Sequence, residues 1–231
     1  MQIHGFNKST LLDYPRHLAA TIFVGGCNMA CPFCHNGSLV LNPNSQPTIN
    51  PNEILNYLEK RKNILEGVCI SGGEPTLYKD ITGFIGQIKE LGYKVKLDTN
   101  GTNPTLIKDL IDGGLIDYIA MDIKNSKEKY KITAGNKALS IESIEESISF
   151  IMSHKIDYEF RTTIVNELHT KKDMDSIGSW LKGAKAYYLQ AYKDSGDIIS
   201  PGFTSPKKET LITYQDILSN YIENVSIRGI D

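Results

Sequence analysis

Residues 25–37 read GGCNMACPFCHNG and hold three of the four cysteines in the chain: Cys27, Cys31 and Cys34. Spacings of four and three residues in a flexible loop allow three thiolates to face one point. Cysteine thiolates are the ligands that hold iron–sulfur clusters in proteins. A [4Fe–4S] cluster takes four ligands and this loop supplies three, so the spacing predicts a cluster with one iron open to another molecule.

Other interpretations of these cysteines remain open. A structural zinc ion normally takes four ligands, and a site completed by His35 would need two adjacent ligands, Cys34 and His35. The CPFC run of residues 31–34 is also typical of a redox dithiol, which should open a helix close behind a strand. A long loop is favoured instead, because the following residues include Gly37, Pro43, Pro47 and Pro51. Cysteines buried for packing alone are a further possibility, and a zinc-stabilised binding module is the hypothesis outside the enzymes.

Length and composition bound the rest of the molecule. With 231 residues, 40% hydrophobic and 23% charged, we expect one domain over 1–231, with an N-terminal extension (1–17) and a cluster loop (25–37). A formal net charge of −2 gives no reason to expect nucleic acid or an anionic membrane as a partner. Residues 1–15 show no apolar core of signal-peptide length, and no segment approaches the roughly 20 apolar residues of a membrane span. A thiolate-bound cluster needs reducing conditions, so we expect a cytoplasmic protein.

Short apolar runs alternate with segments of helical periodicity along the chain. Six strands are expected, at Leu18–Val24, Gly67–Ser71, Lys94–Asp98, Tyr118–Ile123, Tyr158–Val165 and Ala186–Tyr192. A helix is expected behind each strand, at Pro51–Asn63, Lys79–Leu91, Pro104–Asp112, Ile141–His154, Lys171–Lys182 and Glu209–Ile222. This alternation predicts a parallel sheet with right-handed crossovers, and no GxGxxG follows any strand to favour a dinucleotide-binding open sheet. The expected fold class is therefore α/β, a partial, TIM-like (β/α)6 barrel.

Polar residues follow the predicted strands at the ends where parallel α/β folds place their working groups. They are Cys27 after the first strand, Ser71, Gly72, Gly73 and Glu74 after the second, Asp98, Thr99 and Asn100 after the third, Asp122 and Lys124 after the fourth, Arg161 and Thr163 on the fifth, and Gln190 on the sixth. This agreement is independent of the cysteine spacing. It predicts one site at the mouth of the barrel.

Together these motifs resemble the radical S-adenosylmethionine (SAM) superfamily. The pattern CxxxCxxC with Phe33 before the last cysteine is the superfamily signature, and SGGEPTL, LDTNG and MDIK extend the resemblance over nearly the whole chain. The opening GFNKSTLLDYP and the small size are most similar to activating enzymes of anaerobic ribonucleoside-triphosphate reductases, relatives of the pyruvate formate-lyase activases. One departure is Arg16, where many relatives have glycine after the Asp-Tyr-Pro.

The resemblance implies which residues hold the cluster and SAM. Cys27, Cys31 and Cys34 would be the cluster ligands at the catalytic centre, with Phe33 against the cofactors. Cys69 lies inside an apolar strand and is expected to be a small buried hydrophobe.

The turn of residues 71–74 would hold the SAM amino group in this family. Gly72 and Gly73 have no Cβ, so the backbone can approach a ligand closely. Asn100 and Gln190 are expected to contribute to the same cofactor site.

The resemblance also implies roles for the charged groups. Asp98 and Asp122, with Thr99, would form a monovalent-cation site beside SAM or orient its polar groups. Lys124 and Arg161 can neutralise the SAM carboxylate or bind a substrate carbonyl.

The activity implied is that of a radical SAM oxidoreductase. The resemblance implies reductive cleavage of SAM to methionine and a 5′-deoxyadenosyl radical, with the electron supplied by a flavodoxin- or ferredoxin-type donor. The radical would remove a hydrogen from the Cα of one glycine in a glycyl radical enzyme, expected to be an anaerobic ribonucleotide reductase. Alternatives within the same chemistry are a glycyl radical enzyme of the pyruvate formate-lyase type, or a small molecule or nucleobase as substrate.

Overall fold

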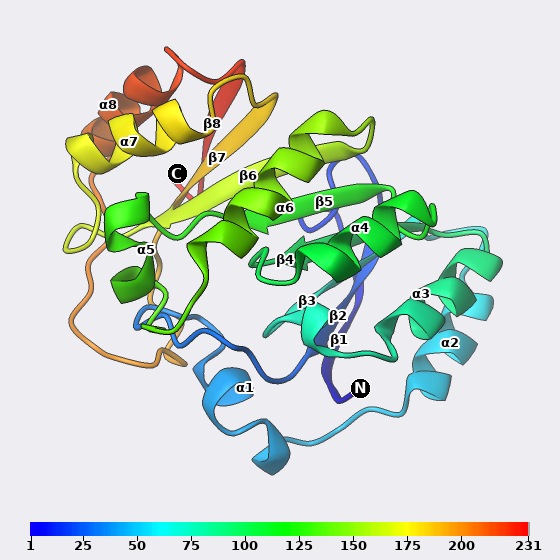
Figure 1. Cartoon of the computed structure of the whole chain (residues 1–231). Helices are drawn as coiled ribbons and strands as arrows, with labels where there is room; N and C mark the ends of the chain where they lie inside the picture. Colours follow the sequence, from blue (N-terminus) through cyan, green and yellow to red (C-terminus); the bar gives the residue numbers. More distant parts are fainter. Residues whose placement is uncertain (231) are drawn as a thin grey trace.

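The computed structural model describes residues 1–230, and one continuous sheet of eight strands organises them (Figure 1). The strands are β1 (Ile3–Thr10), β2 (Ala19–Val24), β3 (Gly67–Gly72), β4 (Lys94–Thr99), β5 (Tyr118–Asp122), β6 (Asp157–Ile164), β7 (Ala186–Ala191) and β8 (Asn224–Arg228). They lie side by side in chain order, with β1 antiparallel to β2 and every later pair parallel.

Helices connect successive parallel strands and lie outside the sheet (Figure 1). They are α1 (Gly37–Leu41), α2 (Pro51–Glu59), α3 (Ile81–Glu90), α4 (Pro104–Asp112), α5 (Lys127–Thr133), α6 (Ile141–Ser153), α7 (Lys171–Trp180) and α8 (Lys208–Leu218), with the 3₁₀ turns η1 (Pro43–Ser45) and η2 (Pro75–Leu77). The six predicted strands correspond to β2–β7, and a helix follows each of them. The α/β class and the partial, parallel (β/α)6 barrel are confirmed. The two end strands, β1 and β8, do not pair within residues 1–230, so the barrel is open.

The two end strands are the main difference from the expected element order. Residues 1–17, expected as an extension, contribute β1, whose backbone pairs with β2 from Ile3–Val24 to Thr10–Ala19. Most of β1 is half-buried or exposed, so its sequence carries little apolar periodicity. The same holds for β8, a five-residue strand with no fully buried side chain. Both strands form because their backbones pair with a neighbouring strand, β2 for β1 and β7 for β8.

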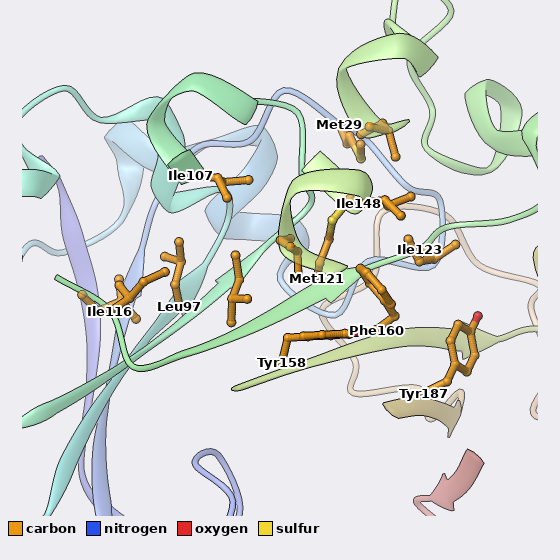
Figure 2. Close-up of a cluster of buried hydrophobic side chains, with 14 of the residues drawn as sticks. Met29, Leu97, Ile107, Ile116, Met121, Ile123, Ile148, Tyr158, Phe160 and Tyr187 are labelled. Carbon is orange, nitrogen blue, oxygen red and sulfur yellow. The ribbon is translucent and has the colours of Figure 1, made fainter. Parts of the chain in front are cut away.

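The hydrophobic core lies between the outer face of the sheet and the helices that cover it (Figure 2). Leu97 of β4, Met121 of β5 and Phe160 of β6 pack in this layer with Ile107 of α4 and Ile148 of α6, and none is more than 3% exposed. Full burial of one such side chain stabilises the fold by about 1.5–3 kcal/mol. Packing in this layer fixes the positions of the strands, and with them the strand ends that carry the polar groups.

Strand alternation sends a second set of side chains to the inside of the barrel. In β4, Val95 and Leu97 belong to the hydrophobic core, whereas Lys96 and Asp98 line cavities within the barrel. The inner face is therefore polar, in contrast to the outer face. Within residues 1–230, no helix is both long and apolar enough to cross a bilayer.

Candidate active site

The C-terminal ends of the parallel strands surround a cavity of about 160 Å³, which we call the cluster cavity. Its lining includes every site residue predicted from the sequence except Glu74 and Gln190. The lining also includes Met29, Asn36 and Val40, which the sequence analysis did not name. All three lie in the cysteine loop or just after it, so nearness in sequence to the cysteines is the signal that points to them.

The cluster loop is held in place by segments far away in the chain. The backbone N–H of Ala30 donates to the carbonyl of Ala134 at 3.0 Å, and the N–H of Ser200 donates to the carbonyl of Pro32 at 2.8 Å. Phe33 is buried, and its ring packs edge-on against His169, with 6.5 Å between ring centroids. Contacts from three later parts of the chain therefore fix the loop over the barrel mouth.

The three cysteine thiols of the loop line the cluster cavity, and none forms a disulfide. Burial raises the pKa of Cys27 to about 12, although a hydrogen bond from the N–H of Met29 to its sulfur acts in the opposite direction. Burial also raises the pKa of Cys31 and of Cys34. Metal binding must therefore displace three protons from these sulfurs, as is general for cysteine ligands.

The donor set fits an iron–sulfur cluster. Three sulfur atoms from one loop surround a single cavity, and thiolates are the ligands that such clusters require. Within residues 1–230, no three Cys, His, Asp or Glu side chains converge closely enough to hold a single metal ion. His35, the fourth ligand of the alternative zinc site, packs its ring against Tyr192 with 5.5 Å between centroids.

Two glycines let the turn after β3 pack directly on the cluster loop. Gly72 has φ +118°, and a Cβ there would lie 2.3 Å from the carbonyl oxygen of Val24. A Cβ at Gly73 would lie 1.9 Å from the carbonyl oxygen of Gly26, immediately before the first cysteine of the loop. Both positions therefore require glycine, because no side chain can be accommodated without moving backbone.

Glu74 lies beside the cluster cavity but does not line it. Its side chain is fully buried, and its carboxylate accepts hydrogen bonds from the N–H and hydroxyl of Thr76, the hydroxyl of Thr99 at 2.7 Å and the N–H of Asn100 at 2.6 Å. Burial raises the pKa of this carboxyl, and the four hydrogen bonds offset part of that rise. Its side chain thus joins the β3 turn to the end of β4, and contact between Glu74 and SAM stays a prediction.

Asp98 and Asp122 form one ion-pair network with three cations. Arg161 contacts both carboxylates, at 3.1 Å from Asp98 and through its Nε at Asp122. Lys124 donates to Asp122 at 2.9 Å, and Lys96 contacts Asp98. Lys96 is not among the residues predicted from the sequence, because a lysine in an alternating strand ordinarily faces solvent.

The network keeps both carboxylates ionised. Burial alone raises the pKa of Asp122, but Arg161 and Lys124 outweigh it and hold that pKa below 3.8. Arg161 and Lys96 lower the pKa of Asp98 in the same way, also against the effect of burial. The charges of this region are therefore fixed at neutral pH.

The monovalent-cation site expected at Asp98, Thr99 and Asp122 does not fit this arrangement. The carboxylate oxygens of Asp98 accept from Ser71 at 2.9 Å, from Arg161 and from Lys96. Those of Asp122 accept from Arg161 and Lys124, and the hydroxyl of Thr99 donates to Glu74. A further cation would have to compete with ammonium and guanidinium groups for every one of these oxygens.

Gln190 lines a second cavity of about 510 Å³ inside the barrel, which we call the barrel cavity. Asp98 and Arg161 line both cavities, so this pair separates the barrel cavity from the cluster cavity. The residues that close the far side include Leu11, Leu12 and Asp13 of the β1–β2 connection and Arg228 of β8. Gln190 therefore faces the barrel interior and not the cysteines.

A family model described as the radical SAM superfamily matches residues 21–181, more than half of the chain. A protein of Methanocaldococcus jannaschii, provisionally named a glycyl-radical enzyme activating enzyme, is 35% identical over 99% of this chain and 96% of its own length. A second protein of that organism with the same provisional name is 26% identical over 89% of this chain and 79% of its own. A Pyrococcus abyssi protein provisionally named a GTP 3′,8-cyclase is 29% identical over 57% of this chain and 43% of its own.

Solved structures show the same fold at low sequence identity. Streptococcus suis SuiB bound to its precursor peptide SuiA superposes with a TM-score of 0.69 at 12% identity, over 89% of this chain and 47% of SuiB. The protein anSMEcpe with bound AdoMet, which is SAM, has a TM-score of 0.61 at 19% identity, over 89% of this chain and 62% of that protein. The family match and the relative of nearly equal length show that this chain is a member of the radical SAM superfamily, an enzyme whose cofactors are a [4Fe–4S] cluster and S-adenosylmethionine.

Proposed function

We propose that the protein is an activating enzyme that forms a glycyl radical on a partner enzyme. The observation that carries this proposal is the similarity to the M. jannaschii protein of that provisional name, which extends over 99% of this chain and 96% of the relative. The activity of a relative depends on the whole chain, and here almost the whole of both chains corresponds.

We assign Cys27, Cys31 and Cys34 as the cluster ligands, because their sulfur atoms share one cavity. Bound there, the cluster and SAM supply a carbon-centred radical by one-electron reduction of SAM. Gly72 and Gly73 keep the β3 turn free of side chains beside the cysteines, so that backbone polar groups can approach SAM.

We assign Lys124 and Arg161 to the carboxylate of SAM. Both line the cluster cavity and carry permanent positive charge, and a guanidinium or ammonium group forms strong charge-assisted hydrogen bonds to a carboxylate. Asp122 holds both cations in place, with 2.9 Å between its carboxylate and Lys124. Phe33 and Asn100 complete the cofactor side of the site, and Glu74 positions the turn from behind.

We assign the barrel cavity to the substrate. It adjoins the cluster cavity through Asp98 and Arg161, and its volume of about 510 Å³ exceeds that of the cluster cavity. Gln190 offers it an amide that can bond to a peptide backbone. A loop from a partner protein can enter such a cavity and become ordered there on binding.

The partner that we propose is an anaerobic ribonucleotide reductase, with a flavodoxin- or ferredoxin-type protein as electron donor and the cytoplasm as compartment. A partner of the pyruvate formate-lyase type is the alternative within the same activity. A nucleobase or small-molecule substrate has weaker support, because the GTP 3′,8-cyclase relative matches 57% of this chain. Membership of an enzyme superfamily excludes the zinc-stabilised binding module. We also propose that residues 1–231 form one domain.

Electron paramagnetic resonance on anaerobic mixtures tests the activity. Reduced protein with SAM and the anaerobic ribonucleotide reductase of the same organism should give a glycyl doublet. Each single alanine variant of Cys27, Cys31 and Cys34 should lose the doublet together with most of its iron and acid-labile sulfide.

Cys69→Ala is the matched control, because Cys69 is fully buried in β3 and lies outside the cluster cavity. This variant should keep its iron and its doublet. Wild-type protein that produces 5′-deoxyadenosine and consumes a small metabolite, with no radical on any glycyl partner, would contradict the proposal. Normal cluster loading in Cys31→Ala would contradict the ligand assignment.

A further inference from the structure

Lys96 is a lysine placed entirely inside the barrel. Its side chain is 2% exposed, although lysine is among the residues least often buried. The ammonium group contacts the carboxylate of Asp98, two residues further along the same face of β4, and lies 3.8 Å from the sulfur of Cys69 on β3. A charge at this depth is stable only with a partner of opposite sign, so Lys96 and Asp98 depend on one another.

The carboxylates at the wall of the cluster cavity already have protein cations. Asp98 and Asp122 line that cavity with Arg161 and Lys124, so two negative charges face two positive ones. Lys96 contacts Asp98 from the side of the barrel cavity, which it lines together with Asp13. A bound monovalent cation would add positive charge beside Arg161 and Lys124, which repulsion at these distances disfavours.

Two other acidic side chains line the barrel cavity: Asp13, which accepts a hydrogen bond from the hydroxyl of Thr21 at 2.5 Å, and Glu159. Glu159 of β6 pairs with Arg228 of β8 through two hydrogen bonds of 2.8 and 2.9 Å, so these two charges cancel. The oxygen atoms expected to bind a cation already accept hydrogen bonds from protein cations or donate elsewhere, as described above. Lys96 is itself a cation in contact with Asp98, so this carboxylate is neutralised without an added ion.

We propose that Lys96 is the built-in countercharge of Asp98, and that the protein binds SAM without the monovalent cation that the family resemblance implies. The inference rests on the proposed position of SAM in the cluster cavity. It is independent of the substrate that the radical attacks, so it can fail while the activating function stands.

The test compares SAM binding in two salts. Protein with a reconstituted, oxidised cluster and no reductant binds SAM without cleaving it, and isothermal titration calorimetry gives the dissociation constant. Potassium chloride and tetramethylammonium chloride are compared at equal concentration, because tetramethylammonium is too large to enter a small-cation site. Wild-type protein should give the same dissociation constant in both salts.

Removal of the lysine charge should create a need for a cation. Lys96→Met should bind SAM on the order of tenfold more weakly in tetramethylammonium than in potassium, since potassium can neutralise Asp98 in place of the ammonium group. Lys94→Met is the matched control, on the same strand but exposed and outside both cavities, and should resemble wild type.

Restoration of SAM binding by potassium in Lys96→Met would show that Lys96 acts as a countercharge. Potassium could not replace a lysine whose role is only structural. Wild-type protein that requires potassium for SAM binding would overturn the inference, and this measurement needs no variant. Equal SAM binding by Lys96→Met in both salts, whether weak or normal, would also overturn it. Lys96→Gln provides a second variant of similar length if the methionine variant does not fold.

Discussion

Gly73→Ala tests whether the turn after β3 and the cluster loop must touch. The added Cβ would lie 1.9 Å from the carbonyl oxygen of Gly26 and 2.6 Å from its carbon. Non-bonded heavy atoms rarely approach within about 3 Å, so the two segments have to separate by roughly 1 Å. The separation would also lengthen the hydrogen bond of 2.8 Å from the N–H of Glu74 to the same carbonyl.

The expected loss of stability is about 2–4 kcal/mol, from overpacking against backbone and a weakened buried hydrogen bond. The rate of SAM cleavage should also fall. Gly26 immediately precedes Cys27, so the shift displaces a cluster ligand, and a misplacement of about 1 Å can lower a rate on the order of a hundredfold. Iron and sulfide content, the rate of 5′-deoxyadenosine formation and the guanidinium unfolding midpoint are the three measurements.

Gly83→Ala is the matched control for this substitution. Gly83 lies in α3, and a Cβ added there would meet no neighbouring atom within 4 Å outside its own helix. Alanine favours a helix over glycine by about 1 kcal/mol, so this variant should be slightly more stable. A Gly73→Ala protein with wild-type iron content and rate would refute the reasoning. That result would mean that the turn and the loop move independently.

Two further predictions concern strain and pH. Arg16 has φ +67° and an exposed side chain, and this left-handed conformation costs a non-glycine residue about 1–2 kcal/mol. Glycine removes that strain but loses more backbone entropy on folding, which offsets part of the gain. Arg16→Gly should therefore raise the melting temperature by about 2–3 °C. Arg16→Ala should give no such gain, and equal gains from both would assign the effect to the side chain. Asp122→Asn should destabilise the cluster-free protein by about 3 kcal/mol at pH 7, because it leaves Arg161 and Lys124 without their carboxylate. Because the folded state lowers the pKa of Asp122, the ionised carboxylate stabilises the fold fully above pH 3.8, and this stabilisation is lost as the pH falls. The difference in unfolding free energy between wild type and Asp122→Asn should therefore narrow by about 1.4 kcal/mol per pH unit below pH 3.8 in denaturant titrations. A difference that stays constant with pH would contradict this sign.

Arg16 is a position where the sequence and the structure give complementary information. The family resemblance implies glycine after the Asp-Tyr-Pro, and the sequence has Arg16 there. The structure gives this position a positive φ, a conformation that favours glycine. The helix starts behave similarly: Asn103 before Pro104 predicts a cap, and its side chain accepts a hydrogen bond from the N–H of Leu106 at 3.2 Å. Such local rules can be read from the chain because they depend on neighbouring residues.

The sequence by itself determined the cysteine loop, the six strand–helix units and most of the residues at the strand ends, because these follow from local spacing and from strand and helix periodicity. Tertiary structure alone decided the ends of the sheet, since β1 and β8 exist through pairing with β2 and β7. It also decided the direction of single side chains: Glu74 turns inward to Thr99, and Gln190 faces the barrel cavity. The placement of Lys96 against Asp98 belongs to the same class. The partner of a buried charge is known only once the sheet has folded, because the free energy of burying a charge depends on groups brought from distant parts of the chain.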